Sequence, residues 1–389
     1  PSVAGAQTAT GEQTAAGEQP VAGEQPAPEA DDQDHGRLRT SVLVSIAVIG
    51  VAVLIIGGII FVAQEDQQSG LQTLAASSVV AGSLPRSLPL DYRAGHIVVD
   101  ASFGDARETL PLILDTGAPT ILSAELGERF GGEAAGSITS ASIDGEVTTS
   151  PVVPFDTLEL GGAEFRDVGA VAGFITPGNP LYCISGHGLI GASLMKNAVW
   201  QIDYANEQLA IAASVDGLDH IDSAISLAFT PISEGSPSPI IELPAGDRML
   251  RFLLDTGSDG WLTVNPTDLE GTAAAVDADS PAIATIGAGA SGMFRTRLVW
   301  TEVDLDLGGQ ALSDVPIATT TSLAEGQGNI GNAFLEHYVV TIDWPRSRLY
   351  LDPLTDDPRP DAPASATIGW DGSDYIVGSF AEDAPGTSD

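Results

Sequence analysis

The stretch 112–118, Leu-Ile-Leu-Asp-Thr-Gly-Ala, returns later in the chain as 252–258, Phe-Leu-Leu-Asp-Thr-Gly-Ser. In both copies an apolar run, typical of a buried strand, leads into an Asp-Thr-Gly turn. The two aspartates, Asp115 and Asp255, lie 140 residues apart (255 − 115 = 140). The repeat predicts two related units, each of which supplies one carboxylate.

A second pair of phrases strengthens this interpretation. Gly-Leu-Ile-Gly at 188–191 and Gly-Asn-Ile-Gly at 328–331 each end 76 residues after their aspartate (191 − 115 and 331 − 255). The Gly-Gly pairs at 161 and 308 are 147 residues apart instead (308 − 161), so insertions compensate between the copies. A single Asp-Thr-Gly turn arises by chance in roughly one chain in ten of this length. Two copies in matching surroundings do not fit that explanation.

Composition narrows the classes of function. The chain has 389 residues, of which 43% are hydrophobic, so it can build a sizeable core. Its net charge of −38 argues against nucleic acid as a partner, because phosphate binding needs clustered Lys and Arg. Cys183 is the single cysteine, which excludes an intrachain disulfide, and we expect it to be a small buried hydrophobe.

No cofactor or metal is expected. The five histidines form no cluster with metal-ligand spacing. Stretches 186–191 and 326–331 match the Gly-x-Gly-x-x-Gly dinucleotide fingerprint. We reject that function because the next strand begins near Val199, which leaves no room for a crossover helix.

The N-terminal part predicts a membrane anchor. Residues 1–36 are of low complexity and are expected to form a disordered acidic tail. Residues 41–63 form a 23-residue apolar run without charge, which as a helix spans about 34 Å. A cleaved signal peptide fits less well because the run is too long. Arginines precede the run and acids follow it, so we expect a single-pass cell-membrane protein with a cytoplasmic N-terminus.

Changes in residue composition divide the rest of the chain into a linker, two lobes and a tail. Residues 64–88 are Ser- and Ala-rich and are interpreted as a stalk linker. Short β-branched runs broken by Gly, Pro and Asp predict mainly β lobes at 89–215 and 226–356. Residues 357–389 form an acidic tail that faintly resembles the start of a PDZ domain, truncated at its end.

The chemistry of the repeat follows from its residues. Two carboxylates held close together cannot both ionise, so one can act as base and the other as acid toward a water molecule. Gly117 and Gly257 let backbone amides approach the carboxylates, and Thr116 and Thr256 carry hydroxyls that can bridge the two copies. Ser258 can donate to Asp255, whereas Ala118 cannot donate to Asp115 through its side chain, so the two sites are expected to differ.

The two copies resemble the active-site loops of pepsin-like and retropepsin-like aspartic proteases. The resemblance covers about residues 91–353 and implies a bilobal, mainly β acid-protease fold with the active site between two homologous lobes. It implies that Asp115 and Asp255 are the catalytic pair. The supporting loop would be Thr116, Gly117, Ala118, Thr256, Gly257 and Ser258. The apolar-Gly element would be Leu189, Ile190 and Gly191 in one copy and Ile330 and Gly331 in the other, where polar Asn329 departs from the pattern.

The family also implies a mobile hairpin flap, but no Tyr-Gly pair marks it here. Candidate flaps lie around Gly145 and Gly287, and either is equally compatible with a plain surface hairpin. The resulting hypothesis is a membrane-anchored aspartic endopeptidase that acts on peptides or proteins outside the cytoplasm. With two copies in one chain, the protease unit is expected to be monomeric. The alternative is a catalytically silent bilobal β-module that binds peptides or surface partners.

Overall fold

The computed structural model describes residues 64–106, 108–141, 147–173, 175–177, 181–233, 236–277, 279–289, 292–355, 368–370 and 375–377. The predicted cytoplasmic tail and the predicted membrane anchor at 41–63 lie outside these ranges. Within them, no helix combines the length and apolar character needed to cross a bilayer.

The described chain is mainly β, with two large sheets and one small hairpin. The first sheet consists of β1 (Ser78–Val79), β3 (Asp91–Arg93), β4 (His96–Phe103), β5 (Leu110–Asp115), β6 (Ile121–Leu122), β7 (Ser137–Ala141), β8 (Val147–Leu160), β9 (Ala163–Ala172) and β10 (Gly188–Gly191). The second consists of β2 (Arg86–Pro89), β11 (Val199–Asp203), β12 (Gln208–Ala212), β13 (Ile225–Ser233), β14 (Ser236–Ala245), β15 (Arg248–Leu254), β16 (Leu262–Val264), β17 (Ile283–Gly289), β18 (Gly292–Leu307), β19 (Gln310–Thr319), β20 (Gly328–Ile330), β21 (Tyr338–Asp343) and β22 (Arg348–Pro353).

The remaining elements are short. The helices with defined bounds are α2 (Ala124–Phe130), α3 (Leu181–Ile184), α4 (Ala192–Met195) and α5 (Asn332–Leu335), with 3-10 turns η1 (Ala81–Ser83), η2 (Pro266–Leu269) and η3 (Trp344–Arg346). The hairpin is β23 (Ile368–Trp370) with β24 (Tyr375–Val377), within the stretch interpreted as an acidic tail.

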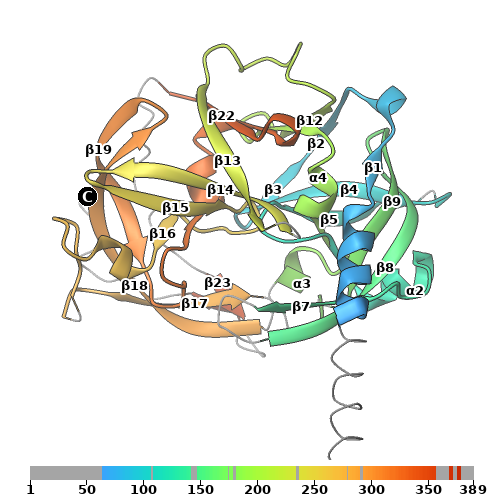
Figure 1. The fold of residues 1–389 in the computed structure, drawn as a ribbon, viewed down its shortest axis with the longest axis horizontal. Helices are drawn as coiled ribbons and strands as arrows, with labels where there is room; N and C mark the ends of the chain where they lie inside the picture. The colour runs from blue at the N-terminus through green and yellow to red at the C-terminus, as the bar shows by residue number, and fades with distance from the viewer. Residues whose placement is uncertain are drawn as a thin grey trace, which may run out of the picture. The chain divides into compact units, whose positions relative to one another are not determined.

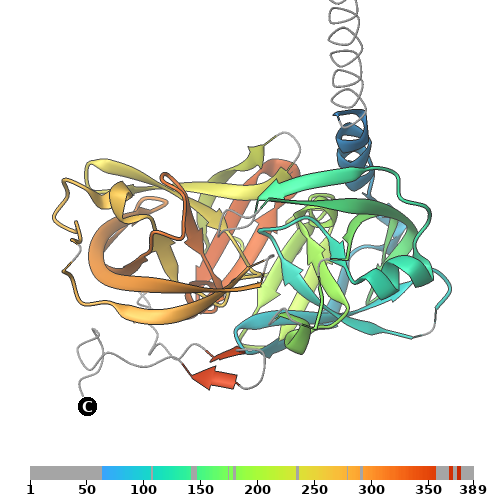
Figure 2. The same ribbon diagram turned by 90° about the horizontal axis from the view of Figure 1, so that it is seen from below.

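Each large sheet contains six strands that close on themselves (Figures 1 and 2). The first ring runs β9-β6-β10-β5-β4-β8, and β8 pairs back onto β9. The second ring runs β19-β16-β20-β15-β14-β18, and β18 pairs back onto β19. Parallel pairings fall at the same places in both rings, between β5 and β10 and between β15 and β20. The two copies of the sequence phrase therefore occupy the same place in the same strand order.

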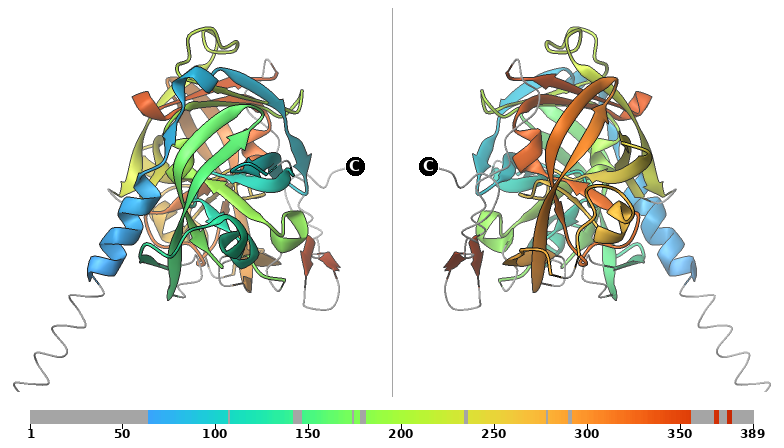
Figure 3. Two further views of the ribbon diagram at one scale, coloured as in Figure 1. Left: turned by 90° about the vertical axis from the view of Figure 1, so that its right-hand side faces the viewer. Right: turned by 90° about the vertical axis from the view of Figure 1, so that its left-hand side faces the viewer.

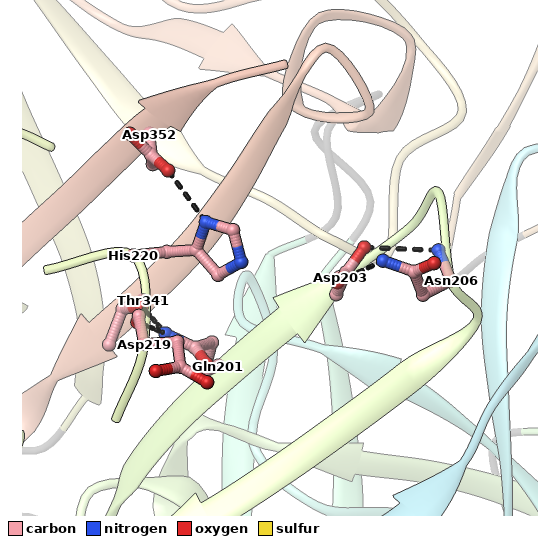
Figure 4. A network of polar contacts seen from close by, with 7 residues as sticks. All are labelled: Gln201, Asp203, Asn206, Asp219, His220, Thr341 and Asp352. Atoms are coloured by element: carbon pink, nitrogen blue, oxygen red, sulfur yellow. Dashed lines mark hydrogen bonds and ion pairs between the residues drawn. The ribbon is translucent and has the colours of Figure 1, made fainter. Parts of the chain in front are cut away.

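Six further strands, β13-β22-β21-β11-β12-β2, extend the second sheet as an antiparallel layer. In this layer Gln201 of β11 lies opposite Thr341 of β21, and the Gln201 amide nitrogen donates to the Thr341 hydroxyl at 2.9 Å (Figure 4). These two residues are 140 apart (341 − 201), so each lies opposite its own repeat. β11 and β12 follow the first ring in sequence and yet pair with β21 and β2, so residues 199–212 do not belong to the first sheet.

The hydrophobic core extends through both rings and the layer that joins them. One large cluster of buried side chains includes Leu114 of β5, Trp200 of β11 and Leu254 of β15, each with an exposed fraction of 0%. The Trp200 indole stacks on Phe165, with 5.8 Å between ring centroids. Because the runs that precede both aspartates lie in this core, their ends are held by the packing of the whole protein.

The prediction that 64–88 is a stalk linker is wrong. Residues 64–75 form a helix that lies beside β8 and β9 (Figures 1 and 3), and the following residues enter β1 and β2. Leu74 is buried in a second hydrophobic cluster, and a Cβ on Gly70 would lie 2.3 Å from the Ser137 carbonyl oxygen. The small residues that suggested a solvated linker instead permit close approach of the backbone.

The expectation that Cys183 is buried is also wrong. Cys183 is exposed on α3, a four-residue helix none of whose side chains is buried. The neighbouring Tyr182 has an exposed fraction of 40%. Leu181 and Ile184 of this single turn pack against the second hydrophobic cluster, whereas Cys183 does not face that cluster and stays exposed.

Candidate active site

The two Asp-Thr-Gly turns follow equivalent central strands. Asp115 is the last residue of β5 and pairs with Gly191 of β10, while Asp255 directly follows β15. The Asp255 amide donates to the Ile330 carbonyl at 2.9 Å, which ties the second turn to β20 in the same way. Both carboxylates are thus carried by strands that have neighbours on both sides.

Four hydrogen bonds between the turns bring the two halves together. The amide of Thr116 donates to the Thr256 hydroxyl at 3.0 Å, and the amide of Thr256 donates to the Thr116 hydroxyl at 3.0 Å. The Thr116 hydroxyl donates to the Leu254 carbonyl at 2.5 Å, and the Thr256 hydroxyl donates to the Leu114 carbonyl at 2.9 Å. Both threonines have an exposed fraction of 0%. The predicted bridging role of the two hydroxyls is therefore present in the structure.

The two glycines place each turn against the carboxylate of the other copy. The Gly117 amide donates to Asp115 Oδ1 at 2.8 Å, and the Gly257 amide donates to Asp255 Oδ1 at 3.0 Å. A Cβ on Gly257 would lie 2.3 Å from the Asp115 carboxyl carbon, and one on Gly117 would lie 2.6 Å from Asp255 Oδ1. Such distances are far below van der Waals contact, so a side chain at either glycine would displace a carboxylate.

Burial and mutual charge perturb the pair. Burial is the main cause that raises the pKa of Asp115 well above its usual value, and the negative charge of Asp255 raises it further. Burial also raises the pKa of Asp255, although hydrogen bonds from the Asn329 amide, Asp115 and the Gly257 amide lower it in part. Two neighbouring carboxyls with raised pKa values share protons as a unit, as water activation by acid and base requires.

The prediction that Ser258 donates a hydrogen bond to Asp255 is wrong. The Ser258 hydroxyl accepts from the Gly260 amide at 3.1 Å, and it makes no hydrogen bond to Asp255 among the described residues. Asn329 takes that place, since its Nδ2 donates to Asp255 Oδ2 at 3.0 Å. The expected difference between the two sites is thus present, but it comes from a residue that the sequence pattern marked only as a misfit.

The two apolar-Gly elements pack closely against the backbone that follows each Asp-Thr-Gly turn. A Cβ on Gly191 would lie 2.2 Å from the Pro119 carbonyl carbon, and one on Gly331 would lie 2.3 Å from the Gly260 carbonyl oxygen. The residues that follow repeat the contact, because the Ala192 amide donates to Ala118 and the Asn332 amide donates to Ser258, both at 2.8 Å. Leu189, Ile190 and Ile330 are buried beside the same strands.

Sequence reasoning missed Asn332. Its Nδ2 donates to the Thr256 carbonyl at 2.7 Å and to the Gly95 carbonyl at 2.8 Å, so it joins the second turn to the β3–β4 turn. Its Oδ1 accepts from the Tyr204 hydroxyl at 2.8 Å, and its exposed fraction is 0%. A polar residue directly after the apolar-Gly element, where the first copy has Ala192, was the available signal.

The candidate flaps fall in two comparable hairpins. Gly287 lies on β17 and pairs with Phe294 of β18. Gly145 lies outside the described residues, between β7 and β8, which pair with each other in the same antiparallel manner. Both flap assignments remain predictions.

Comparison with known proteins gives one family match. Residues 99–194 match the family model described as aspartyl protease. The matched stretch includes the Asp115 turn and the Leu189–Gly191 element, and it supports an aspartic protease family with peptide hydrolysis as the suggested activity. The Asp255 turn lies outside the match. No curated protein was found that matches the chain.

Substitution Thr116→Ala is expected to destabilise the protein by about 2–4 kcal/mol, because the buried Thr256 amide and Leu254 carbonyl lose their partner. Thr116→Ser keeps the hydroxyl and is expected to cost only about 1 kcal/mol for the lost methyl group. Urea unfolding of the two variants checks this. Equal losses would show that the hydroxyl contributes nothing beyond packing.

The raised pKa of Asp115 predicts a pH-dependent stability. The folded state holds the Asp115 proton more tightly than the unfolded state does, so this stabilisation is complete below the unfolded pKa and is lost as pH rises through the folded pKa. Asp115→Asn cannot lose a proton. Its stability relative to wild type should therefore rise with pH from about 4 upward. Urea midpoints between pH 4 and 8 measure the trend, and a difference that stays constant with pH would contradict it.

Proposed function

We propose that this chain is an aspartic endopeptidase of the bilobal acid-protease type, in which Asp115 and Asp255 activate one water molecule. The observation that carries the proposal is the set of four hydrogen bonds between Thr116 and Thr256 and the two strands, which holds two carboxylates together. Two carboxylates held together, one buried and one half-buried, are unfavourable for stability, and a binding module has no need of them.

The chemistry requires no additional group. One carboxylate takes a proton from water as the water oxygen bonds to the peptide carbonyl carbon, and the other carboxyl gives its proton to the carbonyl oxygen. The tetrahedral intermediate then breaks its C–N bond, and the amine nitrogen takes up the proton that the first carboxylate removed from water. The hydroxyl proton of the intermediate returns to the second carboxyl. Both groups thereby regain their starting states, and one amide has become an acid and an amine.

The repeated ring of strands supports the bilobal part of the proposal. Each ring presents its Asp-Thr-Gly turn at the end of the strand next to the apolar-Gly strand. The two turns contact each other through side chains and backbone from both copies. A substrate cleft between two lobes is the arrangement that this duplication favours.

The test is cleavage of a quenched peptide library by the full chain, purified with detergent, over a range of pH. Wild type should cleave, and Asp115→Asn and Asp255→Asn should each lose at least roughly 100-fold in rate. The matched control is Asp259→Asn, which changes an exposed carboxylate on the same loop and should keep activity. Unchanged cleavage in both dyad variants, or no cleavage by a folded wild type, would favour the silent peptide-binding module.

We also propose that the chain is anchored in the cell membrane by residues 41–63, with the protease region outside the cytoplasm. The support is the uncharged 23-residue apolar run, with arginines before it and acids after it. Carbonate extraction of membranes should leave the chain in the pellet, and protease added outside intact cells should reach residues after 63. Release of the chain into the supernatant would contradict the anchor.

A further inference from the structure

The two rings differ at one position that contacts the carboxylate pair. Leu189 of β10 pairs with Ile113 of β5, and Asn329 of β20 pairs with Leu253 of β15. These are equivalent places, since both pairs are separated by the 140-residue repeat (329 − 189 and 253 − 113). One copy thus has an apolar side chain beside its aspartate, and the other has an amide.

The Asn329 amide completes the hydrogen bonding of Asp255. Its Nδ2 donates to Oδ2 at 3.0 Å, while the Gly257 amide donates to Oδ1 at 3.0 Å, so each oxygen of Asp255 accepts an N–H. Asp115 accepts from the backbone amides of Gly117 and Ala118. Leu189 has no polar group with which to add a side-chain donor.

The other end of the same amide gives no structural benefit. Asn329 Oδ1 is buried and has no hydrogen-bond partner in the part of the chain that the structure describes. A buried acceptor without a partner is unfavourable, and leucine at this position would avoid that cost. The contact with the Asp255 carboxylate is therefore what this side chain contributes.

A neighbouring charge also lowers the pKa of Asp255, as the Asn329 amide does. The titratable groups that face Asp255 are Asp115 on β5 and His96 on β4, and the charge of His96 adds to the lowering of the Asp255 pKa by Asn329. Burial raises the pKa of Asp115 and the charge of Asp255 raises it further, which favours the protonated form of Asp115.

We propose that Asn329 is a positioning residue that stabilises the charged form of Asp255 and so leaves the proton of the pair on Asp115. This inference rests on the proposed function and assigns the two roles within it. Asp255 takes the proton from the attacking water, and Asp115 gives its proton to the substrate carbonyl oxygen. The direction follows from Asn329 because an amide N–H donates to a carboxylate oxygen and favours its charged state.

The test is the pH profile of kcat/KM for Asn329→Leu, which copies the residue of the first ring. Loss of the donor should move the acidic limb, where Asp255 ionises, upward by about one pH unit. The alkaline limb, where Asp115 loses its proton, should move little because Asp255 is charged on both sides of that step. Asn329→Ala also removes the amide donor and adds neither charge nor bulk, and it should shift the acidic limb in the same direction if leucine impairs folding.

The matched control is Gln201→Leu, which removes a buried amide from the pair in Figure 4 whose hydrogen bonds go to neutral groups, the Asp219 carbonyl and the Thr341 hydroxyl. It should lower stability and leave both limbs in place. An equal shift of the acidic limb in Gln201→Leu, or an unmoved limb in both Asn329 variants, overturns the proposal.

A second readout does not depend on cleavage. In protein labelled with 13C at the aspartate carboxyls, the first titration step of the pair should move upward in Asn329→Leu, with Asp255→Asn used to assign the signals. If wild type cleaves nothing, the proposed function fails while this titration still tests Asn329. If wild type cleaves and the titration is unmoved, the role of Asn329 alone fails.

Discussion

The reciprocal hydrogen bonds between Thr116 and Thr256 are the constraint on which the rest of the site depends. Two carboxyls that burial makes difficult to ionise would move apart if their loops were free to do so. Each threonine binds the backbone of the other copy at two points, so neither loop can withdraw without breaking buried hydrogen bonds. The structure thereby maintains an unfavourable contact that the proposed chemistry needs.

The same symmetry is imposed a second time, away from the carboxylates. Gln201 and Thr341 lie opposite each other in antiparallel strands and are themselves a repeat pair, as Thr116 and Thr256 are. Two self-facing pairs define one local axis that relates the copies. Asn332 adds a third tie, because it bonds the backbone of both Thr256 and Gly95. The threonine bonds and Asn332 thus hold the two turns at the carboxylates, while the Gln201–Thr341 contact joins the copies in a separate layer of strands.

The sequence predicted contacts of the site correctly where only one residue type fits the geometry. Gly117 and Gly257 had to be glycine because a carboxylate of the other copy occupies the space of a side chain, so the motif predicted the contact. Ser258 and Asn329 were not distinguishable in that way, since both can donate and their reach depends on register between strands. The helix at 64–75 was missed because Gly70 serves equally in a linker or in close packing.

A symmetric scaffold holds this pair, but the proposed reaction gives its carboxyls different roles, because a single proton resides on one of them at a time. In a fully symmetric site either carboxyl would hold the proton with equal probability, so the two roles would be interchangeable. The polar differences between the copies lie in the second copy. It has Asn329 where the first copy has Leu189, and Asn332 where the first copy has Ala192. Both asparagines contact the second loop, one at its carboxylate and the other at its backbone. The duplication therefore explains how the carboxylates meet, and the departures from it are the source of the different roles that we propose for them.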